Sequence, residues 1–306
     1  MQQIHRLSRR EIKTILHHTG NVCILLAAAM LIPILVTFIY NEPKYIASFL
    51  YSAIISAVIG FLLVKLFRVE MKMTLKSAMI FSTIIWLVAC ALGSLPYYLS
   101  GELSYLNSYS NVDAVSYTMN FWRAFTQWIG GLGIIFLLLA LLRSTGVDVM
   151  RLYMAEGREE RLVPSIKHST RIIVYMYSLF TLIAIALFFI AGMPLFDSVF
   201  HAFTTLSTGG FGMHNNSILY YNSVWIEIVA MIIMMIGATN YALHYTILRG
   251  NWREYFKDIE TKVAFTLIII STALVTFMLY NNQVYGNDLL LNLRFSLFQM
   301  VSAITT

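Results

Sequence analysis

The sequence predicts an all-α polytopic membrane protein with about seven transmembrane helices. Hydrophobic residues make up 58% of the 306-residue chain and charged residues only 12%, whereas a soluble domain carries about 25% charged residues. Seven segments reach the length that crosses a bilayer, which is about 20 mostly apolar residues. The basic residues are concentrated in alternate loops between these segments. Length, polarity and charge distribution therefore point to the same fold class.

The seven predicted spans cover approximately residues 21–40, 46–66, 77–98, 121–142, 172–192, 224–247 and 263–280. Cys23 and Cys90 both lie within spans, so neither a disulfide framework nor a thiolate metal site is indicated. The first apolar run is too long for a cleavable signal peptide. The sequence contains no nucleophile–base–acid set, phosphate loop or nucleic-acid motif. We therefore expect the lipid bilayer as the surroundings, no bound cofactor, no nucleic-acid partner and no enzymatic activity.

The distribution of lysine and arginine predicts the topology. Of the 21 basic residues, all but Lys44, Arg123 and Arg294 fall in the N-terminal segment and in three alternate loops. Basic residues mark the cytoplasmic side of a membrane protein. The N-terminus is therefore expected in the cytoplasm, and the segment around residues 193–221 is expected to open outside.

The same pattern divides the chain into parts. The predicted parts are a cytoplasmic basic lead-in (1–20), an accessory transmembrane hairpin (21–75), a first repeat (76–142), a charged cytoplasmic linker (143–171), a second repeat (172–248) and a third repeat (249–306). Each repeat consists of a span, an external segment and a returning span. Repetition of such units around an axis is one way in which a single chain can enclose a pore.

The external segment of the second repeat, Leu195–Ser217, reads LFDSVFHAFTTLSTGGFGMHNNS. Its apolar pattern is too short to span a bilayer. Asp197 is expected to cap a short helix that runs to Thr205, and an irregular run follows. Non-helical backbone at membrane depth is tolerated only where it is buried or lines a wet cavity. The pattern is typical of a re-entrant pore loop, and an ordinary external loop with a glycine turn is the alternative.

A pore loop of this composition suits a cation. The predicted pore helix carries Asp197, His201, Thr204 and Thr205, and the predicted filter run is Ser207, Thr208, Gly209 and Gly210. Backbone carbonyls and hydroxyls can replace the hydration shell of an ion, and the helix directs its negative C-terminal end towards it. We expect Gly209 to supply the permissive backbone angles. Asp197, which has no basic neighbour in sequence, is expected to favour cations outside.

A second copy of this pattern occurs near residue 306. Phe200 lies eight residues before Thr208, and Phe298 lies eight residues before Thr306. Each threonine follows another hydroxyl residue, Ser207 or Thr305. The register therefore predicts that Thr305 and Thr306 lead into a second filter run.

Two further side chains have alternative interpretations. His201 on the predicted pore helix is more readily explained by packing or hydrogen bonding than by metal ligation. Glu227 falls within the outer half of a span, where an ionisable group is costly and is often functional. A purely structural role is the alternative for Glu227.

Three sequence motifs of the chain are similar to those of a known family. FWRAFTQWIGGLGII, FHAFTTLSTGGFGMHNNSI and MMIGATNYALHYTILRG resemble the TrkH-like branch of the Trk/Ktr/HKT potassium transporter superfamily. The resemblance implies K⁺ uptake through four span–pore–span repeats, with one filter glycine from each repeat. It assigns Gly209 as the glycine of the second repeat, and the backbone of Thr208 and Gly209 as ligands for the transported K⁺. It also implies a homodimer, a cytoplasmic nucleotide-binding (TrkA-like) regulatory subunit and the inner (plasma) membrane of a prokaryote.

The chain departs from the family pattern in two places. The first pore loop is expected to be shortened, because the interval Tyr97–Asn120 contains only Gly101, and a seam is expected near 108–111. The chain also ends at the third pore loop. It is therefore expected to supply one complete filter segment of four and no K⁺-selective flux alone. The alternative function is a non-conducting fragment or a structural or assembly protein of the membrane, which K⁺-dependent growth rescue would distinguish from a transporter.

The topology can be tested by cysteine accessibility. Single cysteines replacing Glu102 and Arg158 are expected to react with an impermeant thiol reagent from opposite sides of the membrane, because the two positions lie in loops of opposite predicted side. Labelling of both from the same side would contradict the assignment.

Overall fold

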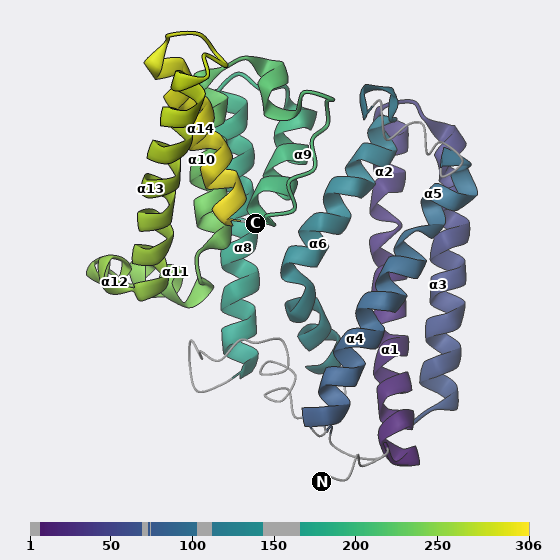
Figure 1. Ribbon diagram of the computed structural model, residues 1–306. Coiled ribbons are helices and arrows are strands. Elements are labelled where there is room, and N and C mark those ends of the chain that lie inside the picture. The colour runs from purple at the N-terminus through teal and green to yellow at the C-terminus, as the bar shows by residue number, and fades with distance from the viewer. Residues whose placement is uncertain (1–6, 69–72, 74, 103–111, 143–165, 306) are drawn as a thin grey trace. The chain divides into compact units, whose positions relative to one another are not determined.

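The computed structural model describes residues 7–68, 73, 75–102, 112–142 and 166–305 (Figure 1). Within these ranges the chain is helical and contains no strand. Two compact units are formed, Met1–Arg171 and Ile172–Thr306. Five helical stretches of the described residues are long and apolar enough to cross a membrane, and two apolar helices are shorter. The predicted all-α class is therefore confirmed for the part of the chain that the structure describes.

The first unit contains six α-helices and two short 3₁₀ turns among its described residues. They are α1 (Arg9–Ala29), α2 (Ile32–Ile39), η1 (Pro43–Tyr45), α3 (Ile46–Leu66), α4 (Leu75–Gly93), α5 (Leu95–Ser100), η4 (Val112–Ala114) and α6 (Tyr117–Leu142). A capping box fixes the start of α1: the Ser8 hydroxyl accepts from the Glu11 amide at 3.2 Å, and the Glu11 carboxylate accepts from the Ser8 amide at 2.9 Å. The predicted lead-in 1–20 therefore contains the start of a capped helix, which begins at Arg9 and continues into the first predicted span.

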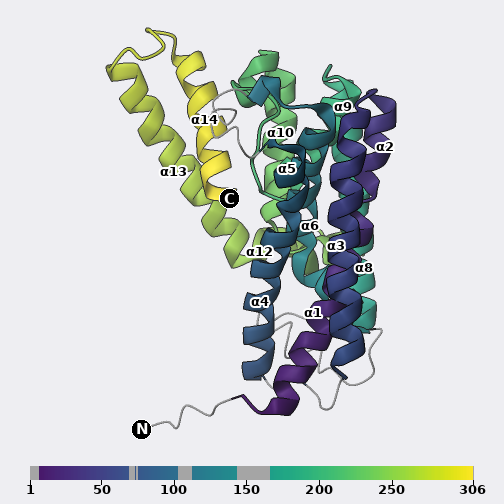
Figure 2. The same cartoon turned by 90° about the vertical axis from the view of Figure 1, so that its right-hand side faces the viewer.

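Two glycines bring α1 and α3 together. A Cβ atom at Gly60 would lie 2.7 Å from the Gly20 carbonyl oxygen, so the two backbones are in direct contact. On the same face of α3, the small side chains of Ser52 and Ser56 are fully buried. Close approach through small residues is the usual packing of membrane helices, since lipid is as apolar as leucine. Figure 2 shows α1 and α3 running beside each other.

Polar contacts with Glu42 and with the end of α4 position α6. The Glu42 carboxylate accepts hydrogen bonds from the Tyr117 and Thr118 amides at 3.1 and 2.9 Å, which satisfies two donors at the N-terminus of α6. Trp122, one turn further on, is fully buried and donates its indole N–H to the Gly93 carbonyl at 3.0 Å. Residues 41–45, which were predicted as an outer loop, therefore hold the N-terminus of α6.

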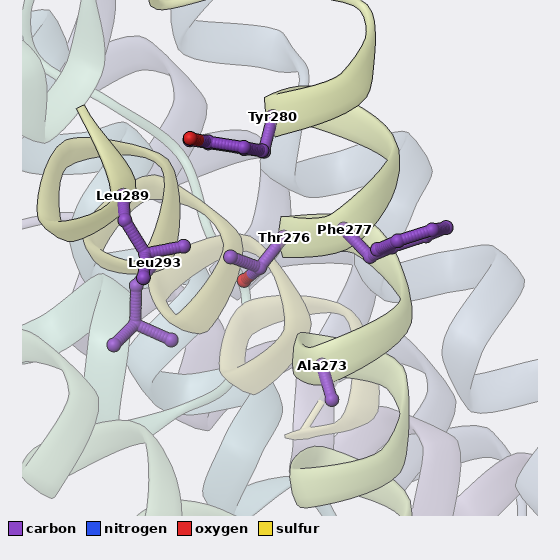
Figure 3. Close-up of a pocket in the computed structure, with 6 residues that line it drawn as sticks. All are labelled: Ala273, Thr276, Phe277, Tyr280, Leu289 and Leu293. Atoms are coloured by element: carbon purple, nitrogen blue, oxygen red, sulfur yellow. The ribbon is translucent and has the colours of Figure 1, made fainter. Parts of the chain in front are cut away.

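The second unit contains the two pore-loop candidates. Its helices are α8 (Ile166–Ile190, which begins in the preceding unit), α9 (Leu195–Leu206), η5 (Ser217–Tyr221), α10 (Val224–Ala238), α11 (Tyr241–Leu248), α12 (Arg253–Lys257), α13 (Ile259–Asn281) and α14 (Leu289–Thr305). Helices α13 and α14 pack as a hairpin in both views (Figures 1 and 2). A shallow groove of about 320 Å³ lies between them, lined by Ala273, Thr276, Phe277, Tyr280, Leu289 and Leu293 (Figure 3). The lining is mostly apolar, which does not suit an ion.

The predicted continuous span 224–247 is broken. Helix α10 ends at Ala238, and Thr239 takes an extended conformation with φ −79° and ψ 142°. The Thr239 hydroxyl donates to the Met235 carbonyl at 2.7 Å, and the His244 Nε2 atom lies 2.9 Å from the Ile236 carbonyl oxygen. Backbone groups must be satisfied inside a membrane, and where the helix stops the His244 side chain contacts the Ile236 carbonyl, while the Met235 carbonyl also accepts the Thr239 amide at 3.1 Å. Hydropathy alone does not detect this break, because the residues on both sides are apolar.

The contact between α1 and α3 can be tested with a matched pair of glycine variants. Gly60→Leu is expected to lower the stability of the detergent-solubilised protein by about 1–3 kcal/mol, because the added side chain must separate the two backbones. The control is Gly130→Ala in α6, where nothing lies within 4 Å of the added Cβ and removal of a helical glycine is expected to stabilise by roughly 0.5–1 kcal/mol. Thermal unfolding measures both. A Gly60→Leu protein as stable as the wild type would show that the contact is not tight.

Candidate functional site

The predicted pore helix is a helix in the structure, with nearly the predicted bounds. Helix α9 covers Leu195–Leu206, against the expected 197–205. Eight of its residues are buried, namely Asp197, Ser198, Phe200, His201, Ala202, Thr204, Thr205 and Leu206. Its length of 12 residues corresponds to about 18 Å at 1.5 Å per residue, which is shorter than the bilayer core. The helix thus has the dimensions of a half-membrane helix.

Asp197 is not the N-cap of α9 that the sequence predicts. The residue before the helix is Pro194, which makes no side-chain cap, and Asp197 lies within the first turn. The Tyr221 hydroxyl donates to its Oδ2 atom at 2.6 Å, and the His214 Nε2 atom lies 3.5 Å from the same oxygen. Asp197 is only 7% exposed. It therefore ties the start of α9 to the chain that returns from the loop.

Aromatic packing adds to these contacts between the start of α9 and the returning chain. The His214 ring stacks on Tyr220, with centroids 3.6 Å apart and an interplanar angle of 12°. Burial and the hydrogen bond to Asp197 raise the pKa of the Tyr221 hydroxyl, so this group remains a protonated donor at neutral pH. Sequence reasoning did not identify Tyr221 or His214. An aspartate followed at some distance by histidine and tyrosine carries no spacing signal, because the three meet only when the loop folds back.

The C-terminal end of α9 is a Schellman motif. The Gly209 amide donates to the Thr204 carbonyl at 2.9 Å, and the Thr208 amide donates to the Thr205 carbonyl at 3.1 Å. These are the two hydrogen bonds that define the motif, and the residue after the cap then takes left-handed angles. Here that residue is Thr208, with φ 55°. The Gly210 amide also donates to Thr204, at 3.2 Å.

The expected backbone role of Gly209 is therefore wrong. The left-handed residues of the filter run are Thr208 and Gly210, at φ 55° and 73°, and Gly209 does not have a positive φ. The reason is the Schellman geometry, which requires left-handed angles at the first residue beyond the helix cap. A threonine in this conformation is strained by roughly 1–2 kcal/mol, and the two hydrogen bonds to the end of α9 hold it there.

The carbonyl groups of the filter run are available to a ligand. The amides of Thr208, Gly209 and Gly210 are turned back onto the helix. Among the described residues, no donor bonds to the carbonyl oxygens of Ser207–Gly210 or to the Thr208 hydroxyl. Gly209 and Gly210 are exposed. A run of uncompensated carbonyl oxygens at the negative end of a helix is an arrangement that binds cations.

Helix α10 packs against this end of α9 without a side chain between them. A Cβ atom at Gly237 would lie 3.0 Å from the carbonyl carbon of Leu206 and closer still to its oxygen. Gly237 was not among the predicted site residues, although it lies in the third of the family-like motifs. A glycine within a span was the available signal.

The predicted packing role of His201 agrees with its surroundings. The side chain is 2% exposed, and its ring lies 5.3 to 6.3 Å from the rings of Phe188, Phe200 and Tyr221. Thr204 and Ser207 direct their hydroxyls onto backbone carbonyls one turn earlier, at 3.4 and 3.3 Å. These predicted site residues therefore serve the helix itself, and the free oxygen atoms lie beyond it.

The second filter candidate follows a helix, as the first one does. Helix α14 ends at Thr305, whose hydroxyl donates to the Val301 carbonyl at 2.8 Å. Ser198 and Ser296, each two residues before the matched phenylalanine, are both buried and both donate to the carbonyl four residues earlier, at 2.9 and 2.7 Å. Thr306 lies outside the described residues, as does the expected seam at 108–111.

Glu227 has a partner that the sequence did not reveal. The carboxylate accepts two hydrogen bonds from the Arg294 guanidinium, both at 2.6 Å. Glu227 belongs to the first turn of α10 and is 5% exposed, whereas Arg294 belongs to α14. Among the described residues, no group of three or more His, Cys, Asp or Glu side chains could hold a metal ion.

The hydrogen bond of Asp197 can be tested by removing one hydroxyl. Tyr221→Phe is expected to destabilise the protein by about 1–3 kcal/mol, because it removes the 2.6 Å donor of a buried carboxylate. Backbone amides of residues 207–216 are expected to exchange faster with deuterium. Tyr220→Phe is the matched control, since its ring stack on His214 remains. Equal exchange in the two variants would refute the role of the hydrogen bond.

Comparison with known proteins gives a consistent result. Residues 102–306 match the family described as TrkH, cation transport protein. A cation transporter of Methanocaldococcus jannaschii, itself uncharacterized, is 31% identical over 321 residues, which covers 99% of this chain and 64% of the relative. The Trk system potassium uptake protein TrkH of Escherichia coli K12 is 33% identical over 316 residues, covering 94% of this chain and 64% of that protein.

A solved structure shares the fold. The crystal structure of the potassium transporter TrkH from Vibrio parahaemolyticus superposes with a TM-score of 0.79 at 24% identity, covering 95% of this chain and 64% of that one. This chain thus spans about 64% of the length of these relatives. The predicted polytopic membrane fold is confirmed. Because the family match covers two thirds of the sequence and includes α9, α10 and α14, this chain belongs to the TrkH family.

Proposed function

We propose that this protein takes part in K⁺ uptake across a membrane, with Ser207–Gly210 as one segment of a selectivity filter. The observation that carries the proposal is the run of backbone carbonyls beyond α9 that accept no hydrogen bond from any described residue. In a membrane such groups are tolerated only next to water or a ligand. A dehydrated cation bound to these oxygen atoms takes the place of the missing hydrogen-bond donors.

The chemistry suits an alkali cation. Carbonyl oxygens and the Thr208 hydroxyl are neutral ligands that replace water molecules without trapping the ion. The C-terminal end of α9 adds a partial negative charge of about half an elementary charge. In this proposal K⁺ binds the backbone of Thr208 and Gly209, and Gly210 holds the turn. The names of the relatives, which are potassium uptake proteins, support K⁺ over other cations.

A filter needs several such segments around one ion. We place Thr305 and Thr306 on the approach to another segment, which the shared register of α9 and α14 supports. The remaining oxygen ligands would come from further repeats or from other copies of the chain. Ion transport, and not enzymatic catalysis, is the activity in question.

The location and the partners follow from charge and from the relatives. We propose the inner (plasma) membrane of a prokaryote, with the N-terminus cytoplasmic, because the basic residues lie in alternate loops. The relatives are named as parts of a Trk system, which supports a cytoplasmic, TrkA-like nucleotide-binding subunit. The charged linker 143–171 is its proposed contact, and the protein is proposed to be a homodimer.

A second candidate is a non-conducting membrane protein with a structural or assembly role. Its support is that Ser207–Gly210 is the one complete filter candidate among the described residues, and a single run cannot surround an ion. K⁺-dependent growth of an uptake-deficient host that expresses the chain separates the two candidates: rescue supports transport, and no rescue at full membrane expression supports the second candidate.

The filter assignment can be tested in a full-length relative. A chimera of E. coli TrkH that carries residues 192–217 of this chain is expected to take up Rb⁺. Gly210→Ala in that chimera is expected to weaken K⁺-over-Na⁺ discrimination, because alanine disfavours the positive φ by roughly 1–2 kcal/mol and tilts the carbonyls. Competition of Rb⁺ uptake by K⁺ and by Na⁺ measures the effect.

Gly192→Ala is the matched control for this variant. Gly192 also has a positive φ, 100°, with nothing within 4 Å of an added Cβ, but it lies at the other end of α9. It is expected to keep the selectivity. Equal loss in both variants would attribute the effect to general backbone strain, and unchanged selectivity in Gly210→Ala would contradict the assignment of the filter.

A further inference from the structure

We propose that Glu227 and Arg294 are positioning residues that set the place of the second filter candidate: their ion pair fixes α14 against α10, the helix that also supports the end of α9. This inference rests on the proposed function, because it assigns α14 to a filter segment. It assigns a positioning role to two residues that do not belong to the filter run itself.

The first argument is the geometry of the pair. Arg294 Nε and one terminal nitrogen donate to the two oxygen atoms of one carboxylate, both at 2.6 Å. Such a bidentate pair fixes orientation as well as distance, since two parallel hydrogen bonds allow little rotation. The two side chains are 67 residues apart in sequence and join two helices that no short loop connects. The contact therefore fixes the position of α14 relative to α10.

The second argument is burial. The side chains of Arg294 and Glu227 are 24% and 6% exposed, and both helices are apolar enough for a membrane. Removing one partner of a buried pair leaves an uncompensated charge, which is strongly unfavourable. The pair thus resists separation of the two helices far more than an exposed surface pair does.

The third argument is the place of α10 between the two filter candidates. Near its C-terminal end, Gly237 contacts the backbone of Leu206, the last residue of α9. In its first turn, Glu227 holds Arg294 on α14. Figure 1 shows α10 beside both α9 and α14, and the helix contacts agree. In this proposal the two filter segments face the same ion, and α10 fixes their relative position because it contacts both α9 and α14.

The charge balance agrees with this role. Arg294 lies on a helix whose C-terminal end leads into a proposed cation site, and a free guanidinium there would repel cations. The carboxylate of Glu227 neutralises it at contact distance. Arg294 can therefore position α14 through its two hydrogen bonds without adding an unpaired positive charge to this helix.

The test measures helix positions and transport separately. In the full chain with both native cysteines replaced by alanine, spin labels are placed at exposed positions on α10, α14 and α9: Ile232, Leu290 and Leu195. The isosteric variant Glu227→Gln is expected to broaden the 232–290 distance distribution at least twofold and to leave the 232–195 distribution unchanged. The control is Glu254→Gln, which removes an exposed pair with Lys257 and is expected to change neither distribution.

Three outcomes overturn the inference. They are an unchanged 232–290 distribution in Glu227→Gln, broadening of both distributions, and the same broadening in the control. Glu227→Asp, which keeps the charge, is expected to recover at least half of the lost order, and no recovery would also count against the pair.

A flux measurement keeps the inference separate from the proposed function. In a chimera of E. coli TrkH that carries residues 192–305 of this chain, Rb⁺ uptake of Glu227→Gln is expected to lose at least threefold in K⁺-over-Na⁺ preference relative to Glu254→Gln. No selective uptake by the unsubstituted chimera would count against the proposed function, while the distances still decide whether the pair positions α14. Selective flux that Glu227→Gln leaves unchanged would overturn the inference alone.

Discussion

The need to satisfy backbone hydrogen bonds away from water governs the second unit. Helix α9 stops after 12 residues, and its last carbonyls accept the amides of Thr208, Gly209 and Gly210. Helix α10 stops at Ala238, where the Met235 carbonyl accepts both the amide and the hydroxyl of Thr239, and the His244 Nε2 atom lies 2.9 Å from the Ile236 carbonyl oxygen. Because amides are used up in this way, the oxygen atoms of Ser207–Gly210 are left without donors. The feature that we assign to ion binding is thus a consequence of how α9 ends.

The tight structure around the loop explains how such oxygen atoms keep their direction. Asp197, Tyr221 and His214 join the start of α9 to the returning chain, and Gly237 lets α10 approach its end. The helix is therefore held at both ends by contacts distant in sequence. Strain at Thr208 is compatible with this arrangement, since surrounding contacts are what maintain strained backbone at functional sites.

The sequence predicted the helical elements with good accuracy where the signal was long and periodic. Each predicted span is mostly helical in the described residues, with interruptions at residues 30–31, 94 and 239–240, and α9 differs from its predicted bounds by two residues at one end and one at the other. The start of α1 and the break after α10 were missed. Ser8 as a helix cap and Thr239 as a helix end are decided by hydrogen bonds, whereas hydropathy records only whether a residue prefers lipid to water.

The candidate site also combines features that the sequence predicted with features that it did not. Composition, charge asymmetry and the Ser-Thr-Gly-Gly run determined by themselves that this is a membrane protein and which short segment carries exposed backbone. They could not assign the left-handed angles to Thr208 and Gly210, nor find that Asp197 is paired with Tyr221, nor that Glu227 meets Arg294. Local patterns reflect the preferences of single residues and of neighbours within a helical turn. Pairing between residues 24 or 67 positions apart depends on how the helices pack, so only the tertiary structure decided it.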